Sequence, residues 1–317
     1  MANMIGNGRI NRAFSGIPTF LRANYAEDLQ ALQAKMAVFG VPFDEGAPYL
    51  PGMRFAPRSI REHSMRFSPS GFYDIDRGQH YLATEILDGS IVDVGDVDIA
   101  PTNIERTLDN ITGLVRTLRS QNLITVGIGG DHSVSYPIIR GFDEPIHVIQ
   151  FDAHLDFAPV TEQIQYSNGQ PFRHVSTLEH VKSITQVGIR SLRVRPSEVA
   201  DTSANGNHVY SMKAFRKSSL EQVFAHLPKG EKCYISIDID AFDMSLTPGC
   251  VSAEPEGFFY QELMDALIAL NEKMTIVGFD LVEVCPSLDV GTGVTSYLAA
   301  HTMVELMGHI FAKQNND

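Results

Sequence analysis

The chain has 317 residues, of which 44% are hydrophobic and 20% are charged, values typical of a globular protein. Its net charge of −13 and its lack of a long basic run argue against a nucleic-acid partner and against an anionic membrane surface. No run of about 18 apolar residues is present, and residues 1–16 include no apolar region of signal-peptide length, so we expect a cytoplasmic location. The three dispersed cysteines predict neither a disulfide scaffold nor a structural zinc site.

The apolar pattern predicts an α/β protein. Residues 1–30 and the Gly- and Pro-rich stretch 44–58 predict irregular segments. Short apolar runs without polar alternation predict strands buried on both faces, at 37–41, 123–128, 146–151, 184–189, 233–239 and 275–284. Apolar residues at helical spacing predict helices around 108–118, 258–271 and 295–313. Strands alternating with helices and the absence of a linker predict one domain over 1–317, with a parallel sheet covered on both sides.

Polar motifs follow four of the predicted strands. Parallel sheets bind ligands at the carboxyl ends of their strands. The motifs there read GGDHS (129–133), DAHLD (152–156), SIDIDAFD (236–243) and LVEVCPSLD (281–289). A buried strand gains nothing from several desolvated polar groups unless they have a task, so these ends predict a functional site.

Two of the motifs place carboxylates at alternate positions. Residues i, i+2 and i+4 of an extended chain share one face, so Asp152, His154 and Asp156 can converge. Carboxylates crowded together repel one another unless cations neutralise them, which predicts two divalent ions. Oxygen with imidazole ligands suits Mn²⁺ and also accepts Fe²⁺, Co²⁺, Ni²⁺ or Zn²⁺. The candidate ligands are His132, Asp152, His154, Asp156, Asp238 and Asp240.

Together these motifs resemble the signatures of the ureohydrolase family, which includes arginase, agmatinase and formimidoylglutamase. The similarity extends to GVPFDEG (40–46), PGMRFAPRSIRE (51–62), VDVGDV (92–97) and QVGIRS (186–191). The resemblance implies an arginase-like, three-layer α/β/α fold with a mainly parallel central sheet. It also implies a dinuclear Mn²⁺ centre and a homotrimer or hexamer, with a mixed oligomer as an alternative.

The resemblance assigns a role to each candidate ligand. One metal would be held by His132, Asp152, Asp156 and Asp238, and the other by Asp152, His154, Asp238 and Asp240. A hydroxide between the metals would attack the central carbon of a guanidino or formimidoyl group. Glu283 would face that cationic group, and Asp156 would pass a proton to the leaving amine.

The substrate side departs from the family pattern. Asn168, in YSNGQPFRH (166–174), stands where arginases and agmatinases generally carry a histidine, and formimidoylglutamase-like sequences tend to read NG there. Asparagine can hydrogen-bond but cannot shuttle a proton. His174 is a candidate to replace that histidine as a catalytic residue. Ala158 stands where arginases use an asparagine to grip the α-carboxylate, so arginine itself is disfavoured.

Two groups of residues are candidates to bind the substrate tail. Arg190, Arg193 and Arg195 follow a strand and could bind a carboxylate. Tyr166 and Phe157 could instead line a small apolar pocket, as an alkylguanidine or a biguanide would require. We therefore predict a metal-dependent hydrolase of a small guanidino or amidine compound. Formimidoylglutamase, a zinc-type deacetylase and a non-catalytic partner subunit are the alternatives.

Overall fold

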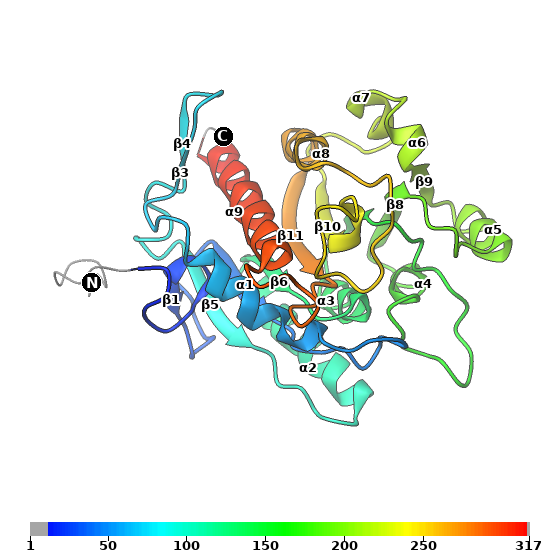
Figure 1. The fold of residues 1–317 in the computed structure, drawn as a ribbon, viewed down its shortest axis with the longest axis horizontal. Coiled ribbons are helices and arrows are strands. Elements are labelled where there is room, and N and C mark those ends of the chain that lie inside the picture. Colours follow the sequence, from blue (N-terminus) through cyan, green and yellow to red (C-terminus); the bar gives the residue numbers. More distant parts are fainter. Residues whose placement is uncertain (1–11, 316–317) are drawn as a thin grey trace.

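A nine-stranded sheet forms the centre of the computed structural model, which describes residues 12–315 (Figure 1). Neighbouring strands are all parallel, in the order β1-β5-β2-β6-β11-β10-β7-β8-β9. The strands are β1 (Asn24–Tyr25), β2 (Met36–Gly40), β5 (Ile91–Asp96), β6 (Ile124–Ile128), β7 (Ile146–Phe151), β8 (Val181–Ile189), β9 (His208–Ser211), β10 (Lys232–Asp238) and β11 (Thr275–Val282). A separate antiparallel hairpin pairs β3 (Phe72–Asp74) with β4 (Gln79–Tyr81).

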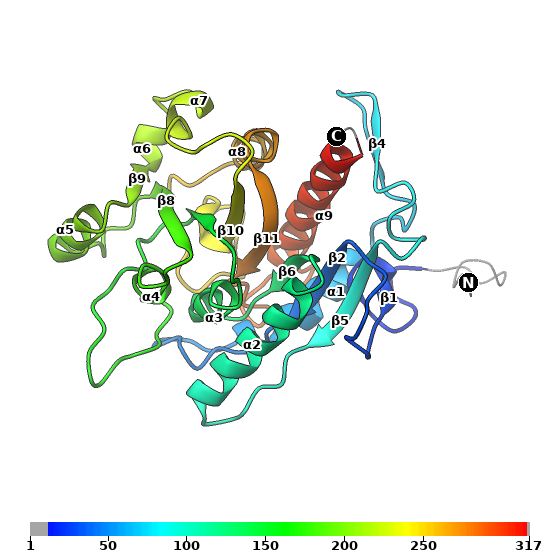
Figure 2. The ribbon, with the colours of Figure 1, turned by 180° about the vertical axis from the view of Figure 1, so that it is seen from behind.

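Helices pack on both faces of this sheet (Figure 2). They are α1 (Ala56–Ser64), α2 (Ile104–Arg119), α3 (Ser135–Ile139), α4 (Pro171–Val175), α5 (Pro196–Ala204), α6 (Met212–Phe215), α7 (Leu220–Val223), α8 (Tyr260–Lys273) and α9 (Val294–Gln314). One-turn 3₁₀ helices are η1 (Phe20–Arg22), η2 (Met53–Phe55), η3 (His132–Val134) and η4 (Ile239–Ala241). The three-layer α/β/α prediction is confirmed.

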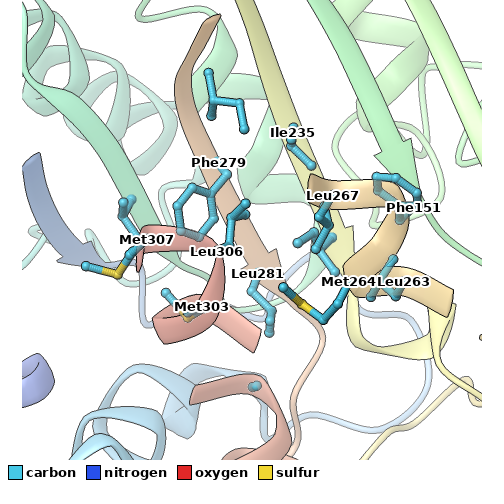
Figure 3. Packing of buried hydrophobic residues seen from close by; sticks show 14 of the residues in the cluster. Phe151, Ile235, Leu263, Met264, Leu267, Phe279, Leu281, Met303, Leu306 and Met307 are labelled. Atoms are coloured by element: carbon cyan, nitrogen blue, oxygen red, sulfur yellow. The ribbon is translucent and has the colours of Figure 1, made fainter. Parts of the chain in front are cut away.

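Successive residues of a strand pack alternately into two separate hydrophobic cores, one on each face of the sheet. In β2, Val38 joins the core beneath α1, α8 and α9, whereas Ala37 and Phe39 join the core beneath α2, α3 and α4. Figure 3 shows the first core, where Met303 of α9 and Leu267 of α8 lie against β11 and β10. Since both sheet faces are buried, the central strands must be apolar throughout, which is the pattern that revealed them.

The six predicted strands and three predicted helices are all confirmed, as β2, β6, β7, β8, β10, β11, α2, α8 and α9. Strands β1, β5 and β9 and helix α1 were not predicted. Helix α1 begins at Ala56, inside the stretch predicted to be irregular. Of the predicted irregular N-terminal segment, residues 1–11 lie outside the described part of the chain.

Residues 12–30 are not wholly irregular, because side chains of the domain bind their backbone. The Phe20 amide donates to Asp93 Oδ2 (2.7 Å), and the Leu21 amide donates to Ser64 Oγ (2.8 Å). Phe20 and Leu21 are themselves buried. Strand β1 then adds to the edge of the sheet beside β5. The prediction of an irregular segment is therefore corrected for Phe20–Arg22 and Asn24–Tyr25.

The four polar motifs meet at one edge of the sheet. Strands β6, β11, β10 and β7 are consecutive neighbours, and each motif lies at a carboxyl end of one of them. Gly130 allows the close approach that this requires, because a Cβ there would overlap the carbonyl oxygen of Phe43. Within residues 12–315, no helix combines the length and apolarity needed to cross a membrane.

Candidate active site

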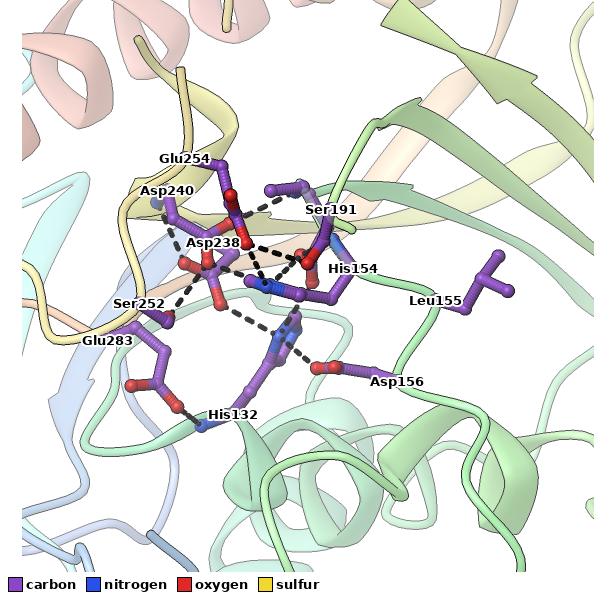
Figure 4. A network of polar contacts seen from close by, with 12 residues as sticks. His132, His154, Leu155, Asp156, Ser191, Asp238, Asp240, Ser252, Glu254 and Glu283 are labelled. Carbon is purple, nitrogen blue, oxygen red and sulfur yellow. Dashed lines mark hydrogen bonds and ion pairs between the residues drawn. The ribbon is translucent and has the colours of Figure 1, made fainter. Parts of the chain in front are cut away.

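The first ligand group surrounds the imidazole of His132 (Figure 4). Its Nδ1 lies 3.0 Å from Asp152 Oδ2, 2.9 Å from Asp156 Oδ2 and 3.1 Å from Asp238 Oδ2. One imidazole hydrogen cannot satisfy three carboxylates, and Nδ1 in fact makes no hydrogen bond although it is buried. A cation among these four side chains would neutralise the carboxylates and accept the free lone pair, so the donor set fits a divalent metal.

Contacts beneath the site leave the Nδ1 lone pair of His132 available. The other ring nitrogen, Nε2, lies 3.0 Å from Ser236 Oγ, and that hydroxyl donates to Asp280 Oδ1 (2.6 Å). Nε2 is therefore the nitrogen that carries hydrogen. A partner that fixes the ring in this way is typical of metal-binding histidines.

The second ligand group surrounds His154. Its Nδ1 lies 3.0 Å from Asp240 Oδ2 and 3.4 Å from Asp152 Oδ1, so Asp152 offers one oxygen to each group. The Cys250 thiol completes a third cluster with Asp238 and Asp240, and nothing in the sequence pattern had singled it out. The structure thus brings all six predicted ligands together in two adjoining groups.

Burial and charge crowding perturb the ionisation of these groups. Burial lowers the pKa of His132, but the three carboxylates that surround its Nδ1 outweigh this and raise that pKa well above its usual value. Burial, and then the charge of Asp152, raises the pKa of Asp156 to about 7. Burial, and then the charge of Asp131, raises the pKa of Glu283 to about 7. The carboxylates of the site therefore repel one another, and a bound cation would reduce this repulsion.

These shifts predict how the stability of the metal-free protein depends on pH. Asp156 and Glu283 have pKa values near 7 in the folded state and about 4 in the unfolded state. The folded state binds more protons between these values, so the free energy of unfolding should fall as pH rises from about 4 to about 7. The raised pKa values of His132 and His154 continue this trend above pH 6.5.

Thermal melts of chelator-treated protein would check this pH dependence. The melting temperature should be lower at pH 8 than at pH 5, and Asp156→Asn should reduce the difference. A melting temperature that rises between pH 5 and pH 8 would contradict the prediction.

A cavity of about 160 Å³ opens beside the two ligand groups. Its wall includes Asp156, Phe157, Ala158, Asn168 and Glu283. Drug-sized ligands occupy roughly 300–1,000 Å³, so this cavity suits a small molecule. The predicted position of Phe157 in the pocket wall agrees with the geometry.

Glu283 presents a free carboxylate oxygen in this region. Its Oε1 accepts hydrogen bonds from the His132 amide (2.8 Å) and from Asn168 Nδ2 (3.0 Å). Its Oε2 is buried and has no hydrogen-bond partner, which leaves it able to receive N–H groups of a ligand. Backbone contacts fix the segment, since the Cys285 amide donates to the Gly249 carbonyl (2.7 Å).

Two residues of the site have left-handed backbone. Asp156 has φ 48° and Glu283 has φ 66°. Residues other than glycine rarely adopt this backbone conformation. Each such residue costs about 1 kcal/mol or more and persists only where its surroundings enforce it. Strain of this kind concentrates at functional sites, and here it aims two carboxylates at the cavity.

Three predicted substrate or catalytic residues lie elsewhere. The His174 ring packs between Tyr136 and Tyr166, and its Nε2 lies 2.6 Å from the Gln165 carbonyl oxygen. Neither His174 nor Tyr166 is part of the cavity wall. Arg190 turns its guanidinium back to the carbonyls of Asp240 (2.7 Å) and Glu254 (3.0 Å), so it braces the loops instead of facing the cavity.

Other polar residues take the places that these three were expected to fill. Arg193, from the same arginine cluster, lies in the cavity wall together with Glu198 and Ser252. Glu254 lies behind His154, and Asp131 binds the Gly46 amide (2.8 Å) to hold the neighbouring loop. Asp131 lies in the GGDHS motif, and Arg193 belongs to the arginine cluster that the sequence marked. Glu198, Ser252 and Glu254 were not among the candidate residues.

Comparison with known proteins agrees with this geometry. Residues 34–308 match the model of the Arginase family. The chain is 30% identical to proclavaminate amidinohydrolase of Streptomyces clavuligerus over 95% of each chain, and the solved structure of that enzyme superposes with a TM-score of 0.83 over 94% of this chain and 98% of that one. It is 31% identical to an agmatinase of Bacillus cereus, covering 89% and 92% of the two chains. It is 32% identical to guanidinopropionase of Pseudomonas aeruginosa, covering 93% and 92%. The chain therefore belongs to the arginase family of ureohydrolases, which hydrolyse guanidino and amidino carbon–nitrogen bonds.

Proposed function

We propose that this protein hydrolyses a carbon–nitrogen bond of a small guanidino compound other than arginine, at a centre of two divalent cations. The observation that carries the proposal is that two adjoining ligand groups and the free, buried Oε2 of Glu283 lie beside one small cavity. Mn²⁺ is the cation that the oxygen-rich ligands favour, and Fe²⁺, Co²⁺, Ni²⁺ and Zn²⁺ are alternatives. Assembly into homotrimers or hexamers remains a prediction.

The residues of the site would bind the two cations and the guanidinium group. His132, Asp152, Asp156 and Asp238 would hold one cation, and Asp152, His154, Asp238 and Asp240 the other. Bound cations supply an activated water nucleophile at neutral pH and offset the carboxylate charge. Glu283 Oε2 would accept N–H groups of the planar guanidinium, and Asn168 would keep Glu283 in place through its hydrogen bond to Oε1.

Asp156 is suited to move the proton. It lies in the cavity wall and belongs to the first ligand group, so its carboxylate is placed to take a proton from the attacking water and to pass it on. Water adds its oxygen to the guanidino carbon, the carbon–nitrogen bond breaks, and Asp156 Oδ delivers the proton to the departing amine. The products are urea and an amine.

The substrate tail would meet a wall of mixed charge. Arg193 and Glu198 both line the cavity, so the first favours an anionic tail and the second a cationic one. Ala158 offers no hydrogen bond to an amino-acid head group, which agrees with the exclusion of arginine. The exposed guanidinium of Arg193 favours guanidino acids as the first candidates and formimidoylglutamate as the second.

Urea release by purified protein loaded with Mn²⁺ or Ni²⁺ tests the proposal. The panel is 3-guanidinopropionate, 4-guanidinobutyrate, agmatine, arginine, methylguanidine, guanidine and a biguanide, with formimidoylglutamate assayed by formamide release. We expect turnover of a small guanidino compound and none of arginine. If a guanidino acid is the substrate, Arg193→Ala should raise its KM about 10-fold or more, while Glu198→Gln should not.

Silence across the panel with two cations bound would contradict a self-sufficient hydrolase. It would instead favour a chain that needs a second subunit type. Amide hydrolysis without urea would favour a deacetylase.

A further inference from the structure

A second cavity, of about 290 Å³, lies between the β3–β4 hairpin and helix α9, which stand side by side in Figures 1 and 2. Its wall includes Phe67, Phe72, Tyr73, Asp74, His301 and Glu305. None of these residues lines the catalytic cavity. Gly308 of α9 lets the hairpin pack this close to the helix, because a Cβ there would lie 2.9 Å from the Phe72 ring. The cavity is therefore separate from the active site.

Aromatic rings form much of this wall, and other rings hold them in place. Phe67 stacks on Tyr297 with ring centroids 5.5 Å apart, and Phe72 stacks on Tyr81 with centroids 5.2 Å apart. Tyr73, on the hairpin, is 61% exposed. The face of an aromatic ring is negative and attracts a cation that lies within about 6 Å of its centre. Rings from the hairpin and from the segment after α1 therefore favour a cation in the cavity.

Glu305 is the carboxylate of the wall that lacks a basic partner. Its side chain is only 17% exposed, and no lysine or arginine in residues 12–315 forms an ion pair with it. Asp74, by contrast, pairs with Arg77 at 2.9 Å. A largely buried charge is costly unless an opposite charge lies beside it. A cation in the cavity would therefore be stabilised by Glu305.

Hydrogen bonds behind the wall leave two acceptors for a ligand. The Tyr260 hydroxyl donates its one hydrogen to Glu305 Oε2 (2.6 Å), so His301 Nδ1, 2.7 Å from the same hydroxyl oxygen, must be a donor. Burial lowers the pKa of His301 more than the charge of Glu305 raises it, so the ring is neutral at pH 7 and its Nε2 is an acceptor. Among residues 12–315, neither His301 Nε2 nor Glu305 Oε1 has a hydrogen-bond partner. Both remain able to receive N–H groups.

We propose that this cavity binds a small organic cation, an ammonium or guanidinium group carried on an aromatic or aliphatic body. The charged group would donate to Glu305 Oε1 and His301 Nε2, and the body would lie against Phe67, Phe72 and Tyr73. Glu305 would repel an anion, and a neutral molecule would gain neither an ion pair nor a cation–π contact. The inference depends on neither the metal centre nor the substrate of the catalytic cavity.

Calorimetric titration of the whole protein with phenethylammonium tests the proposal, and we expect saturable binding. Glu305→Gln should weaken it about 10-fold or more, because a charge-assisted hydrogen bond is lost. Tyr73→Ala alters an exposed residue and should leave the fold intact. It should weaken binding about 3-fold or more through loss of a cation–π contact. Glu283→Gln, in the catalytic cavity, should not change the affinity.

Two uncharged or anionic analogues and one matched variant serve as controls. Phenylethanol and phenylacetate are similar in size to the cation, and both should bind about 10-fold more weakly or worse. Glu272→Gln alters an exposed carboxylate of α8 outside the cavity wall and should not change the affinity. Phenylethanol that binds as tightly as the ammonium would overturn the assignment to a cation.

Three further outcomes would overturn the site itself. One is the absence of detectable binding at about 10 mM phenethylammonium. Another is binding that Glu283→Gln removes and Glu305→Gln does not, which would place the ligand in the catalytic cavity. The third is a changed oligomeric state of Tyr73→Ala in sedimentation, which would identify the hairpin as a subunit contact.

Discussion

Replacing Asp240 with alanine should leave the protein with one tightly bound cation and reduce turnover by more than about 100-fold. Asp240 Oδ2 lies 3.0 Å from His154 Nδ1 and accepts a hydrogen bond from Ser252 (2.9 Å), so its loss leaves the second ligand group with too few donors. Loss of an outer partner of a metal ligand already costs roughly 10- to 100-fold, and a ligand itself should cost more.

Metal content and activity, measured on the same preparation, check the Asp240 prediction. Asp243→Asn is the matched control, because Asp243 lies in the same motif but binds Ser245 and Gly257 instead of the ligand groups. That control should retain two cations. An Asp240→Ala protein that keeps two cations and full activity would exclude the second ligand group as part of the reaction.

Glu283→Gln should lower kcat/KM by about 100-fold or more while both cations stay bound. The substitution keeps the size of the side chain and its acceptor toward the His132 amide. It removes the negative charge that Oε2 would offer to a guanidinium, and hydrogen bonds between charged groups are about twice as strong as neutral ones. The reaction should suffer because the planar group is no longer held in the orientation that attack requires.

Steady-state kinetics and metal analysis together distinguish loss of guanidinium binding from loss of the metal site. The matched control is Glu231→Gln, an exposed carboxylate that pairs with His147 at the far end of β10. It should leave kcat/KM unchanged. If Glu283→Gln lost a cation, or kept full kcat/KM, Glu283 would not be the guanidinium partner.

The metal ligands could be predicted from sequence because local geometry determines them. Asp152, His154 and Asp156 sit on alternate residues at the end of an apolar strand, and the parallel sheet brings β7 beside β10. Strand β5 was missed because Asp93 interrupts its apolar run. That carboxylate is buried but paired with buried Arg61 (2.8 Å), which lies on α1. Only the folded structure shows the pairing that makes this residue acceptable within a strand.

The substrate side could not be predicted, because loop paths decide where its side chains point. Arg190 and Arg193 are three residues apart in one arginine cluster, yet one braces carbonyls and the other lines the cavity. Their difference depends on the carbonyls of the 240–255 loop, which approach Arg190 from another part of the sequence. Glu254 lies 100 residues after His154 in sequence, and no periodic pattern links the two.

The strand order has a consequence for the lifetime of the protein. The ligands of the first group come from β6, β7 and β10, and β11 lies between β6 and β10 in the finished sheet. Such non-local parallel pairings form slowly, because long chain loops must close before any contact is gained. His132 meets the other three ligands only after β11 has joined β6 to β10, so we expect a bound cation to strengthen contacts that form late. Cations should therefore slow unfolding more than they speed folding, and metal supply would govern how long each molecule survives.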